Sequence, residues 1–397
     1  MDFATSLQPY IDLLPYAGAA FLAALLLTPI AGTIAHKVGA MDLPASMRKR
    51  NDKTVSTRIH KEAKPRLGGM AVLIPVILIA FSQMELTTPI LGILIGLIIL
   101  VISGVIDDIK ELSGGSQIII HFSVALLVVV TGSTISEIVV AGLNLNFNFF
   151  EAALHFGAYT YNFIFPADLI TILWIMAIIN AVNWVSGIDA LGEGVTIIAS
   201  VTIMLLAIKL GRPEIAILPA VLSGGVLGFL PYNFPPSKIL GGGAADAPYG
   251  FLLAVLSIVG GAKITTAIII LSVPIIDMIW VILYRLKEHT DVPFLKRPFV
   301  SGRVHLHHRL MSLGFTPKQT LVIESTAMTI SAVVAFYFGG FSTTLIAAIS
   351  VFAGLLVGFV IITFINRKRQ IEEVDKLPEP EPEEPEDTQT PEERFAY

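Results

Sequence analysis

Residues 87–106 read TTPILGILIGLIILVISGVI and lead directly into Asp107 and Asp108. These twenty residues carry no charge. A helix of about 20 consecutive apolar residues is long enough to cross the hydrocarbon core of a bilayer. The stretch therefore predicts a transmembrane helix that ends on a pair of carboxylates.

Similar apolar runs recur along the whole chain. Apolar residues make up 54% of the 397 residues and charged residues only 14%, against roughly 25% charged in a typical soluble domain. The runs occupy residues 12–34, 67–82, 87–106, 117–133, 168–184, 195–208, 214–230, 250–262, 265–284, 320–338 and 342–365. They predict an all-α polytopic membrane protein with about 10–11 transmembrane helices. We expect small residues such as Gly224 and Gly228 to mediate helix packing. The absence of cysteine excludes disulfides and thiolate chemistry.

Positively charged residues fall almost entirely on one side of the predicted helices. With the N-terminus outside, the predicted cytoplasmic segments hold 23 of the 26 Lys and Arg residues. Cytoplasmic segments carry such an excess, so we expect a multi-pass plasma-membrane protein with its C-terminus in the cytoplasm. The predicted outer segment 134–166 has no Lys or Arg. Within it, Glu137–Phe150 alternates partly like short strands, which predicts a small external β-hairpin.

The end of the chain differs in composition from the rest. We expect residues 1–366 to form the integral membrane domain and residues 367–397 to form a cytoplasmic tail. The tail is acidic, rich in Pro and Glu and without apolar periodicity, so it is predicted to be disordered. The remaining membrane body is net basic, which suits acidic lipids or phosphorylated substrates. We expect no nucleic-acid partner.

The unusual polar groups concentrate in the predicted cytoplasmic segments. A transporter is expected to place such groups near the bilayer midplane, whereas polar groups at one water interface suit an enzyme that joins a soluble substrate to a lipid. Asp107 and Asp108 end a helix, where negative charge is unfavourable. They are either a solvated helix end or a pair that faces phosphate through a base or metal role. Arg66, just before a predicted helix start at 67, can hold an anion together with free backbone amides.

Asn180, Asn183 and Gly187 are spaced i, i+3 and i+7 where the predicted helix 168–184 reaches the cytoplasm, and Asp189 follows. Two amides and a carboxylate on one line can recognise a nucleobase edge and a ribose by hydrogen bonds. The alternative is that the asparagines form polar contacts between helices.

Two further loops carry candidate groups. Lys238 precedes Gly241–Gly243, a run that is either a flexible turn or a place where backbone and lysine meet a phosphate. A late basic loop combines imidazoles with guanidinium groups, namely His305, His307, His308, Arg303 and Arg309. Zinc is disfavoured because adjacent His307 and His308 do not easily face one ion. The loop is either a phosphate-binding cluster or a solvated basic loop that attracts anionic lipids.

The ordered set of motifs resembles the polyprenyl-phosphate N-acetylhexosamine-1-phosphate transferase family, also called glycosyltransferase family 4. The motifs are R-x-H (58–60), PRLGG (65–69), G-x-x-DD (104–108), N-x-x-N-x-x-x-G-x-D (180–189), PPSKI (235–239), GFLLAVLSI (250–258), PIIDMIW (274–280) and HLHHRLMSLGF (305–315). The HLHHRL form is similar to the N-acetylglucosamine-type branch, which initiates surface glycans and cell-wall polymers.

The resemblance implies a reaction and its partners. A UDP-N-acetylhexosamine and a polyprenyl phosphate such as undecaprenyl phosphate would give a polyprenyl-diphospho-sugar and UMP, with Mg²⁺ or Mn²⁺ as cofactor. Membrane lipids would surround the protein, and a homodimer is compatible with the family. The implied catalytic residues are Asp107, Asp108, His305, His307 and His308. By the resemblance, Asn183, Gly187 and Asp189 would belong to the uridine pocket. Together with the groups singled out above, the substrate-binding candidates are Arg66, Asn180, Asn183, Gly187, Asp189, Lys238, Arg303 and Arg309. The metal candidates are Asp107, Asp108, Asp189 and Asp246.

The chain departs from the family pattern at three acidic positions, which hold Ser186, Gly243 and Gly302. The family's principal metal-binding Asp is the one replaced by Gly243. Loss of a group that positions a catalytic cation costs several kcal/mol of transition-state stabilisation, at about 1.36 kcal/mol for each tenfold in rate. Either Asp246 reaches back to replace it, or the remaining carboxylates hold the ion weakly.

Three functions are therefore compared. The first is an active phosphoglycosyltransferase. The second is a catalytically degenerate relative that binds UDP-sugar or polyprenyl phosphate and acts as a partner or regulator of a true transferase. The third is a lipid or solute transporter, suggested by three ionisable residues within apolar runs, His121, Asp277 and Glu324.

Overall fold

A computed structural model describes residues 3–44, 62–140, 143–157, 159–260, 264–300, 302–338 and 344–374. The R-x-H motif at 58–60 and the tail after residue 374 lie outside the described residues. The helices are α1 (Phe3–Ile11), α2 (Leu14–Val38), α3 (Gly68–Gln83), α4 (Thr88–Lys110), α5 (Gly114–Val130), α6 (Ala167–Val185), α7 (Leu191–Lys209), α8 (Pro213–Asn233), α9 (Gly243–Val259), α10 (Ile264–Ile270), α11 (Ser272–Glu288), the short 3₁₀ helix η3 (Phe294–Phe299), α12 (Leu306–Ser312), α13 (Pro317–Phe338) and α14 (Thr344–Val374). The strands are β1 (Met41–Asp42), β2 (Lys64–Pro65), β3 (Glu137–Val140), β4 (Leu143–Asn146), β5 (Asn148–Phe156) and β6 (Tyr159–Pro166).

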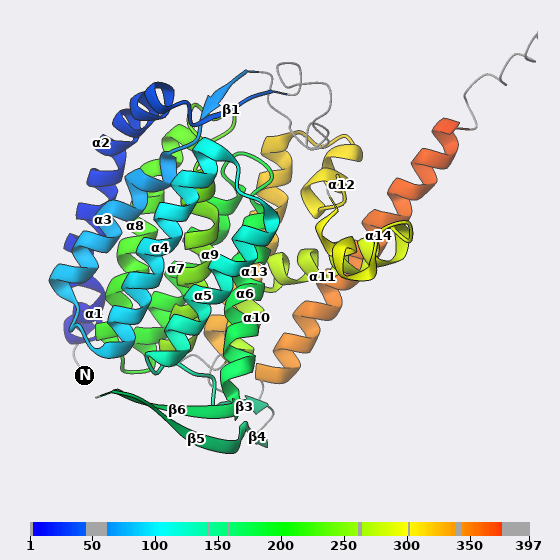
Figure 1. Cartoon of the computed structure of the whole chain (residues 1–397). Helices are drawn as coiled ribbons and strands as arrows, with labels where there is room; N and C mark the ends of the chain where they lie inside the picture. The colour runs from blue at the N-terminus through cyan, green and yellow to red at the C-terminus, as the bar shows by residue number, and fades with distance from the viewer. Residues whose placement is uncertain are drawn as a thin grey trace, which may run out of the picture.

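The predicted all-α polytopic architecture is confirmed (Figure 1). Among the described residues, 7 helices are long and apolar enough to cross a membrane, and α10 with α11 forms a further, bent pair. The three shorter apolar helices are α3, α5 and α9. Each of the predicted apolar runs coincides with one of these spans or helices, so the chain is a multi-pass membrane protein.

The run 265–284 was predicted as one helix, whereas the structure divides it into α10 and α11. The chain bends by 80° between α10 and α11. Pro274 lies four residues after Ile270, the last residue of α10. A proline ring clashes with the carbonyl four residues earlier and lacks an N–H to donate to it. The helix therefore ends and restarts in a new direction.

The bundle is built around α8 and α9. α9 packs against α3, α4, α6 and α7, and its residues 250–257 are all buried. A helix that is apolar on every side is stable only when other helices surround it. α8 packs against α2 through Gly224 and Gly228, where a Cβ would lie 2.2 Å from backbone oxygens of α2. The predicted packing through small residues is confirmed at these two glycines.

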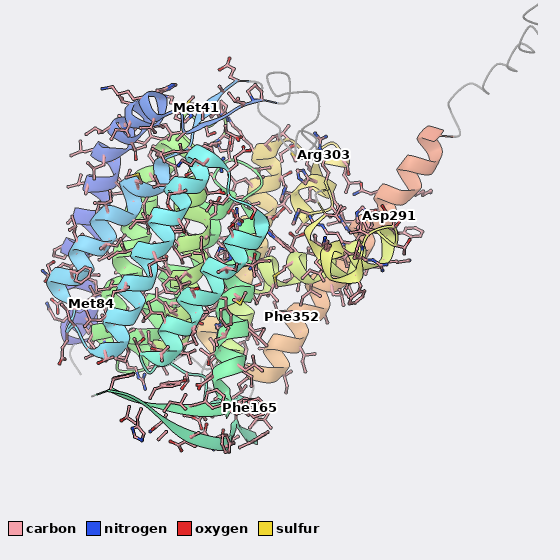
Figure 2. The ribbon with its side chains drawn as sticks, viewed as in Figure 1. Met41, Met84, Phe165, Asp291, Arg303 and Phe352 are labelled. Atoms are coloured by element: carbon pink, nitrogen blue, oxygen red, sulfur yellow. The ribbon has the colours of Figure 1, made fainter. Side chains whose placement is uncertain are left out.

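The two ends of the bundle differ in structure. The segment 134–166, for which one small hairpin was predicted, forms two antiparallel hairpins, β3–β4 and β5–β6. They lie together at one end, which we call the hairpin end (Figure 1). The opposite end carries β1, β2, α12 and the C-terminal end of α4, and we call it the motif end. Figure 2 shows Met41 and Arg303 at the motif end and Phe165 at the hairpin end.

α14 stands partly away from the other helices (Figure 1). Of the residues in its apolar stretch Ile349–Asn366, only 6% are buried within the protein. The helix continues to Val374, so residues 367–374 are helical and not part of a disordered tail as expected. The sequence RKRQIEEV at these positions contains mostly good helix formers, which extend a helix that the apolar run has already nucleated.

Candidate active site

Asp108 joins three segments at the motif end. The residue is 3% exposed, and its carboxylate accepts hydrogen bonds from the backbone N–H groups of Gly243 at 2.8 Å and Ala244 at 3.3 Å. Arg66 Nε lies 2.9 Å from Asp108 Oδ1. A carboxylate is favourable at a helix N-terminus, where N–H groups lack partners within the helix. The start of α9 and the guanidinium thus offset the unfavourable position of this charge at the end of α4.

Glycines allow these segments to approach each other. A Cβ on Gly104 would lie 2.3 Å from the carbonyl oxygen of Gly243, so only glycine lets α4 pack on the start of α9. Gly242 has φ +74°, and a Cβ there would lie 2.5 Å from Asp108 Oδ2. The run Gly241–Gly243 is therefore a fixed helix entry and not a flexible turn, one of the two interpretations left open by the sequence.

The start of α3 does not offer free amides, contrary to the prediction of an anion site there. The N–H groups of Gly68 and Gly69 donate to the carbonyl oxygens of Leu240 and Gly241 at 3.0 and 2.9 Å. The glycines of this motif bring α3 against the loop before α9. What remains available for substrate is Arg66 itself.

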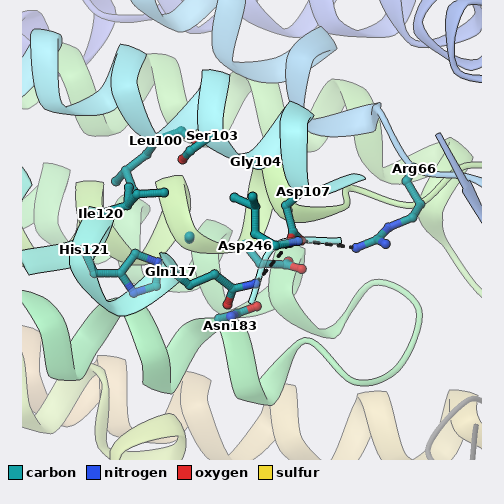
Figure 3. Close-up of a pocket in the computed structure, with 13 residues that line it drawn as sticks. Arg66, Leu100, Ser103, Gly104, Asp107, Gln117, Ile120, His121, Asn183 and Asp246 are labelled. Atoms are coloured by element: carbon teal, nitrogen blue, oxygen red, sulfur yellow. Dashed lines mark hydrogen bonds and ion pairs between the residues drawn. The ribbon is translucent and has the colours of Figure 1, made fainter. Parts of the chain in front are cut away.

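Asp107 faces a small pocket beside Asp108. Its Oδ1 accepts from the backbone N–H of Leu112 at 2.7 Å and from Gln117 Nε2 at 3.1 Å, while its Oδ2 lies 3.9 Å from Arg66 Nη2. Figure 3 shows Gln117 and Arg66 both reaching this carboxylate. The two hydrogen bonds to Oδ1 thus fix the orientation of the Asp107 carboxylate, and the long ion pair with Arg66 holds Oδ2.

The pocket has a polar side and an apolar side. Its polar lining comes from five segments and comprises Arg66, Ser103, Asp107, Gln117, His121, Asn183 and Asp246 (Figure 3). Leu100 and Ile120 form an apolar wall. The volume is about 130 Å³, below the roughly 300–1,000 Å³ of sites that enclose a whole small molecule. The pocket therefore fits one charged group and the first carbons attached to it.

The predicted line of Asn180, Asn183 and Gly187 is separated in the structure. α6 ends at Val185, so Gly187 is not on the helix face. Asn180 Nδ2 donates to its own helix at Met176 O, 2.7 Å away, while Asn183 lines the pocket. Sequence spacing alone placed these residues together because it extended the helix past its true end.

Asp189 ties two loops together away from the pocket. Its Oδ2 accepts from the backbone N–H of Ser237 at 2.8 Å and from Lys64 Nζ at 3.2 Å. Lys64 Nζ also donates to Ser237 Oγ at 2.7 Å. The neighbouring Lys238 side chain is exposed. Asp189 therefore acts here as a clamp between the loop after α6 and the loop before α9.

Asp246 lies in the first turn of α9 and interacts with the Ser186 hydroxyl. A Cβ on Gly192 would lie 2.2 Å from Ser186 Oγ and 3.5 Å from Asp246 Oδ1, so the first turn of α7 closes over the pair. Glu193 is buried nearby, with Oε1 3.0 Å from the Cβ position of Gly241. In the described part of the chain, no three His, Asp or Glu side chains gather as a metal-binding group. Asp107 and Asp246 line the pocket, whereas Asp189, which is bonded to Ser237 and Lys64, is not among its lining residues.

The late basic loop, residues 303–309, which we call the His loop, packs on the end of α6. A Cβ on Gly187 would lie 2.2 Å from His307 Nε2, and His307 is 1% exposed and stacked on His305 at 5.5 Å. Burial, followed by repulsion from His308 and His305, lowers the pKa of His307 well below its usual value. Burial also lowers the pKa of His308 to about 4, with smaller contributions from His305 and Arg303. Both imidazoles are neutral near pH 7, so they offer hydrogen bonds and not positive charge to a phosphate.

Arg309 is bound by contacts within the protein. Its Nε donates to Val304 O at 2.7 Å, its Nη1 donates to Thr363 of α14, and its guanidinium lies 4.9 Å from the Trp280 ring centre. It is 7% exposed. Arg303 is exposed beside His308. Of these two predicted substrate contacts, only Arg303 lies where a solute can reach it.

Known proteins resemble this chain over most of its length. The sequence model of the family described as glycosyl transferase family 4 matches residues 90–261. A probable undecaprenyl-phosphate N-acetylglucosaminyl 1-phosphate transferase of Bacillus subtilis (strain 168) is 29% identical over 354 residues, which cover 87% of this chain and 88% of the relative. Over these residues the chain is similar to glycosyltransferase family 4.

Other relatives carry related names. An undecaprenyl-phosphate alpha-N-acetylglucosaminyl 1-phosphate transferase of Escherichia coli (strain K12) is 26% identical over 323 residues, covering 79% of this chain and 80% of the relative. A decaprenyl-phosphate N-acetylglucosaminephosphotransferase of Mycobacterium tuberculosis (strain ATCC 25618 / H37Rv) is 23% identical over 324 residues, 73% of each chain. The family matched by the motifs is thereby confirmed.

Sequence reasoning missed several polar residues of the candidate site. Lys64, Gln117 and Ser237 hold the predicted aspartates in place, and none was singled out. His121 was noticed in an apolar run but not placed, and it lines the pocket. A polar residue inside an otherwise apolar helix was the available signal for Gln117 as well, because such residues usually face the interior.

Proposed function

We propose that this protein transfers an N-acetylhexosamine 1-phosphate from a UDP-sugar to a polyprenyl phosphate such as undecaprenyl phosphate, with release of UMP. The observation that carries the proposal is the pocket between Asp107, Arg66 and Asn183, which has a polar side and an apolar wall. The names of the family 4 relatives supply the substrate class, and the product would begin a cell-wall or surface glycan. The second function, binding without turnover, is favoured by one observation, the internal bonding of the Asp108 and Asp189 carboxylates.

The reaction requires an in-line displacement at phosphorus. An oxygen of the lipid phosphate forms a bond to the β-phosphorus of the UDP-sugar, the bond from that phosphorus to the bridging oxygen breaks, and UMP leaves with the electron pair. The second pKa of a phosphate monoester is about 6, so the attacking oxygen is mostly unprotonated at neutral pH. The protein's task is to orient two anions and to stabilise the added charge.

The residues of the pocket divide this task. Arg66 places a guanidinium beside the phosphates, and the same guanidinium also forms an ion pair with Asp108. Asn183 offers an amide as donor to a phosphate or sugar oxygen, and Leu100 with Ile120 covers the first carbons of the acceptor. Asp108 fixes the start of α9 and so the position of Asp246. The neutral His307 and His308 contribute hydrogen bonds at the neighbouring loop.

Mg²⁺ or Mn²⁺ fits a reduced set of ligands. Mg²⁺ commonly binds through one or two carboxylates together with substrate phosphates and water. Asp107 and Asp246 both line the pocket, whereas Asp108 and Asp189 are occupied by backbone N–H groups and cations. We propose that Asp107 and Asp246 hold the ion, which would neutralise phosphate charge when bound. This pair would replace the carboxylate that Gly243 lacks.

The decisive experiment is release of UMP by the purified protein in lipid nanodiscs. UDP-N-acetylglucosamine, undecaprenyl phosphate and Mg²⁺ are supplied together, and UDP-N-acetylgalactosamine is supplied in a parallel arm. Asp107→Asn is expected to lower turnover strongly, with Glu151→Gln on the exposed outer hairpin as a matched control. Absence of UMP in both arms overturns the proposal. Retained thermal stabilisation by UDP in that case identifies a binding protein that does not turn over.

We also propose that the motif end faces the cytoplasm of a plasma membrane, since nearly all Lys and Arg lie in segments assigned to that side. The chain has no cysteine, so single cysteines can be introduced without background. Lys238→Cys at the motif end should resist a membrane-impermeant maleimide in intact cells, and Glu151→Cys at the hairpin end should react. The reverse pattern would refute the orientation.

A further inference from the structure

Asp277 of α11 makes two hydrogen bonds with the start of the His loop. Its Oδ2 lies 2.7 Å from His305 Nδ1, and its Oδ1 accepts from the backbone N–H of Leu306 at 2.7 Å. Asp277 is 1% exposed and His305 is 8% exposed. One carboxylate oxygen is thus bonded to the His305 imidazole, and the other is bonded to the backbone N–H of Leu306, the first residue of α12.

This geometry decides which nitrogen of His305 carries a proton. An ionised carboxylate only accepts hydrogen bonds, so the nitrogen that faces it must be the donor. The backbone N–H of Leu306 is also a donor, which is consistent with an acceptor at both oxygens. The Asp277 contact therefore places a proton on Nδ1 of His305, and in the neutral form of the ring Nε2 is left with a lone pair.

Two aromatic neighbours hold the ring from other sides. The edge of Trp184 meets His305 at a centroid distance of 6.0 Å and 73°, and His307 stacks on it at 5.5 Å and 5°. Trp184 is the residue after Asn183, which lines the pocket. The orientation of His305 is thus fixed relative to the end of α6, where the candidate substrate groups lie.

We propose that Asp277 is a positioning residue that keeps His305 in the Nδ1–H form, so that Nε2 accepts a hydrogen bond from an O–H group of the substrate. The inference rests on the proposed function, which supplies substrates that carry such groups. Two sources have this chemistry, namely a hydroxyl of the nucleotide sugar and the hydroxyl of a protonated lipid phosphate. A wrongly protonated His305 would present an N–H donor to that hydroxyl and lose the bond.

Nitrogen-15 NMR of the full chain tests the tautomer directly. The protein is labelled with ¹⁵N-histidine in nanodiscs, and the His305 signals among the 8 histidines are assigned by their loss in His305→Gln. Wild type is expected to show a protonated Nδ1 and an unprotonated Nε2. A proton on Nε2 in the wild type overturns the proposal without any variant at Asp277.

Asp277→Asn is the matched perturbation. The Asn oxygen can still accept from Leu306 N–H, but its NH₂ group donates toward His305 Nδ1 and so reverses the tautomer. The expected loss of turnover is roughly 10²–10⁴-fold, the range for a misplaced catalytic proton or wrong tautomer, with a much smaller change in KM. Asp277→Glu retains a carboxylate and is expected to restore the Nδ1–H signature. An unchanged tautomer in Asp277→Asn, or a reversed tautomer with unchanged turnover, refutes the proposal.

Asp168→Asn provides a control of the same kind. Asp168 Oδ2 accepts from the Tyr161 hydroxyl and from the backbone N–H of Ile164 at 2.8 Å, at the hairpin end. This variant loses a comparable buried bond, yet it should leave the His305 signals and turnover as in wild type. Should it reverse the tautomer too, the Asp277 contact is not the cause.

Titration with separate ligands identifies the hydroxyl. A shift of the Nε2 signal with UDP-N-acetylglucosamine but not with UDP assigns it to the sugar. A shift with undecaprenyl phosphate that strengthens below about pH 6 assigns it to the phosphate. No shift with either ligand refutes the proposed hydrogen bond. The wild-type tautomer is measured without turnover, so failure of the transferase assay is distinguishable from failure of this inference.

Discussion

Replacing Asp108 by Asn should destabilise the protein far more than the same change at Asp107. Asp108 is buried and bonded to two N–H groups at the start of α9 and to Arg66. An amide oxygen can keep one of the two N–H bonds, but the NH₂ group then faces another donor. Breaking a buried ion pair costs about 3–5 kcal/mol, and Arg66 is only 17% exposed. We expect a loss toward the lower end of that range.

Asp107→Asn can keep the bond from Leu112 through its amide oxygen. Its other partners are a neutral amide and an ion pair at 3.9 Å, so a loss of about 1 kcal/mol or less is expected. Thermal denaturation in nanodiscs, followed by far-UV circular dichroism, measures both variants. Turnover should fall in both, for different reasons. Equal stability of the two variants would refute the assignment of Asp108 as the structural member of the pair.

Three further outcomes are expected. Gly104→Ala should destabilise the protein by about 1–3 kcal/mol, because the added Cβ would meet the Gly243 backbone. Gly114→Ala should leave stability unchanged, because no atom lies within 4 Å of the added Cβ. Thermal denaturation of the two variants tests this difference. Gly243→Asp, whose Cβ would lie 3.1 Å from Asp107 Oδ2, should tighten Mn²⁺ binding measured by electron paramagnetic resonance and should destabilise the metal-free protein. The pKa of His308 is lowered from 6.5 to about 4, so its contribution to stability is present above pH 6.5 and is lost as pH falls toward 4. In His308→Gln the free energy of unfolding should therefore depend less on pH over this range than in wild type.

Much of the fold was predictable because the membrane imposes a simple rule on sequence. Each span must be apolar and long enough, and the predicted runs coincide with the observed helices. The break after Ile270 was missed, although Pro274 was visible in the run. Proline is tolerated in many membrane helices, so its presence did not decide between a straight helix and a bend.

The candidate site was predictable in its members but not in its connections. The sequence placed Asp107, Asp108 and the His loop at one end, and the structure agrees (Figure 1). It did not show that Asp108 caps a helix that begins 135 positions later. Capping by a distant side chain leaves no local pattern, unlike capping by the residue before the helix. Gly187 was placed on a helix because the spacing rule holds only until the helix ends.

The shared carboxylate of Asp108 has a consequence for how the chain matures during synthesis. Arg66 and Asp108 are inserted well before α9 has been translated. Until Gly243 and Ala244 have been synthesised, the Asp108 carboxylate lacks the two backbone N–H groups that bond to it in the folded protein. The start of α9 thus supplies the last hydrogen bonds to a carboxylate that α4 and Arg66 have already placed. A nascent protein interrupted before α9 should therefore be a substrate for membrane quality control, even if its earlier helices are inserted correctly.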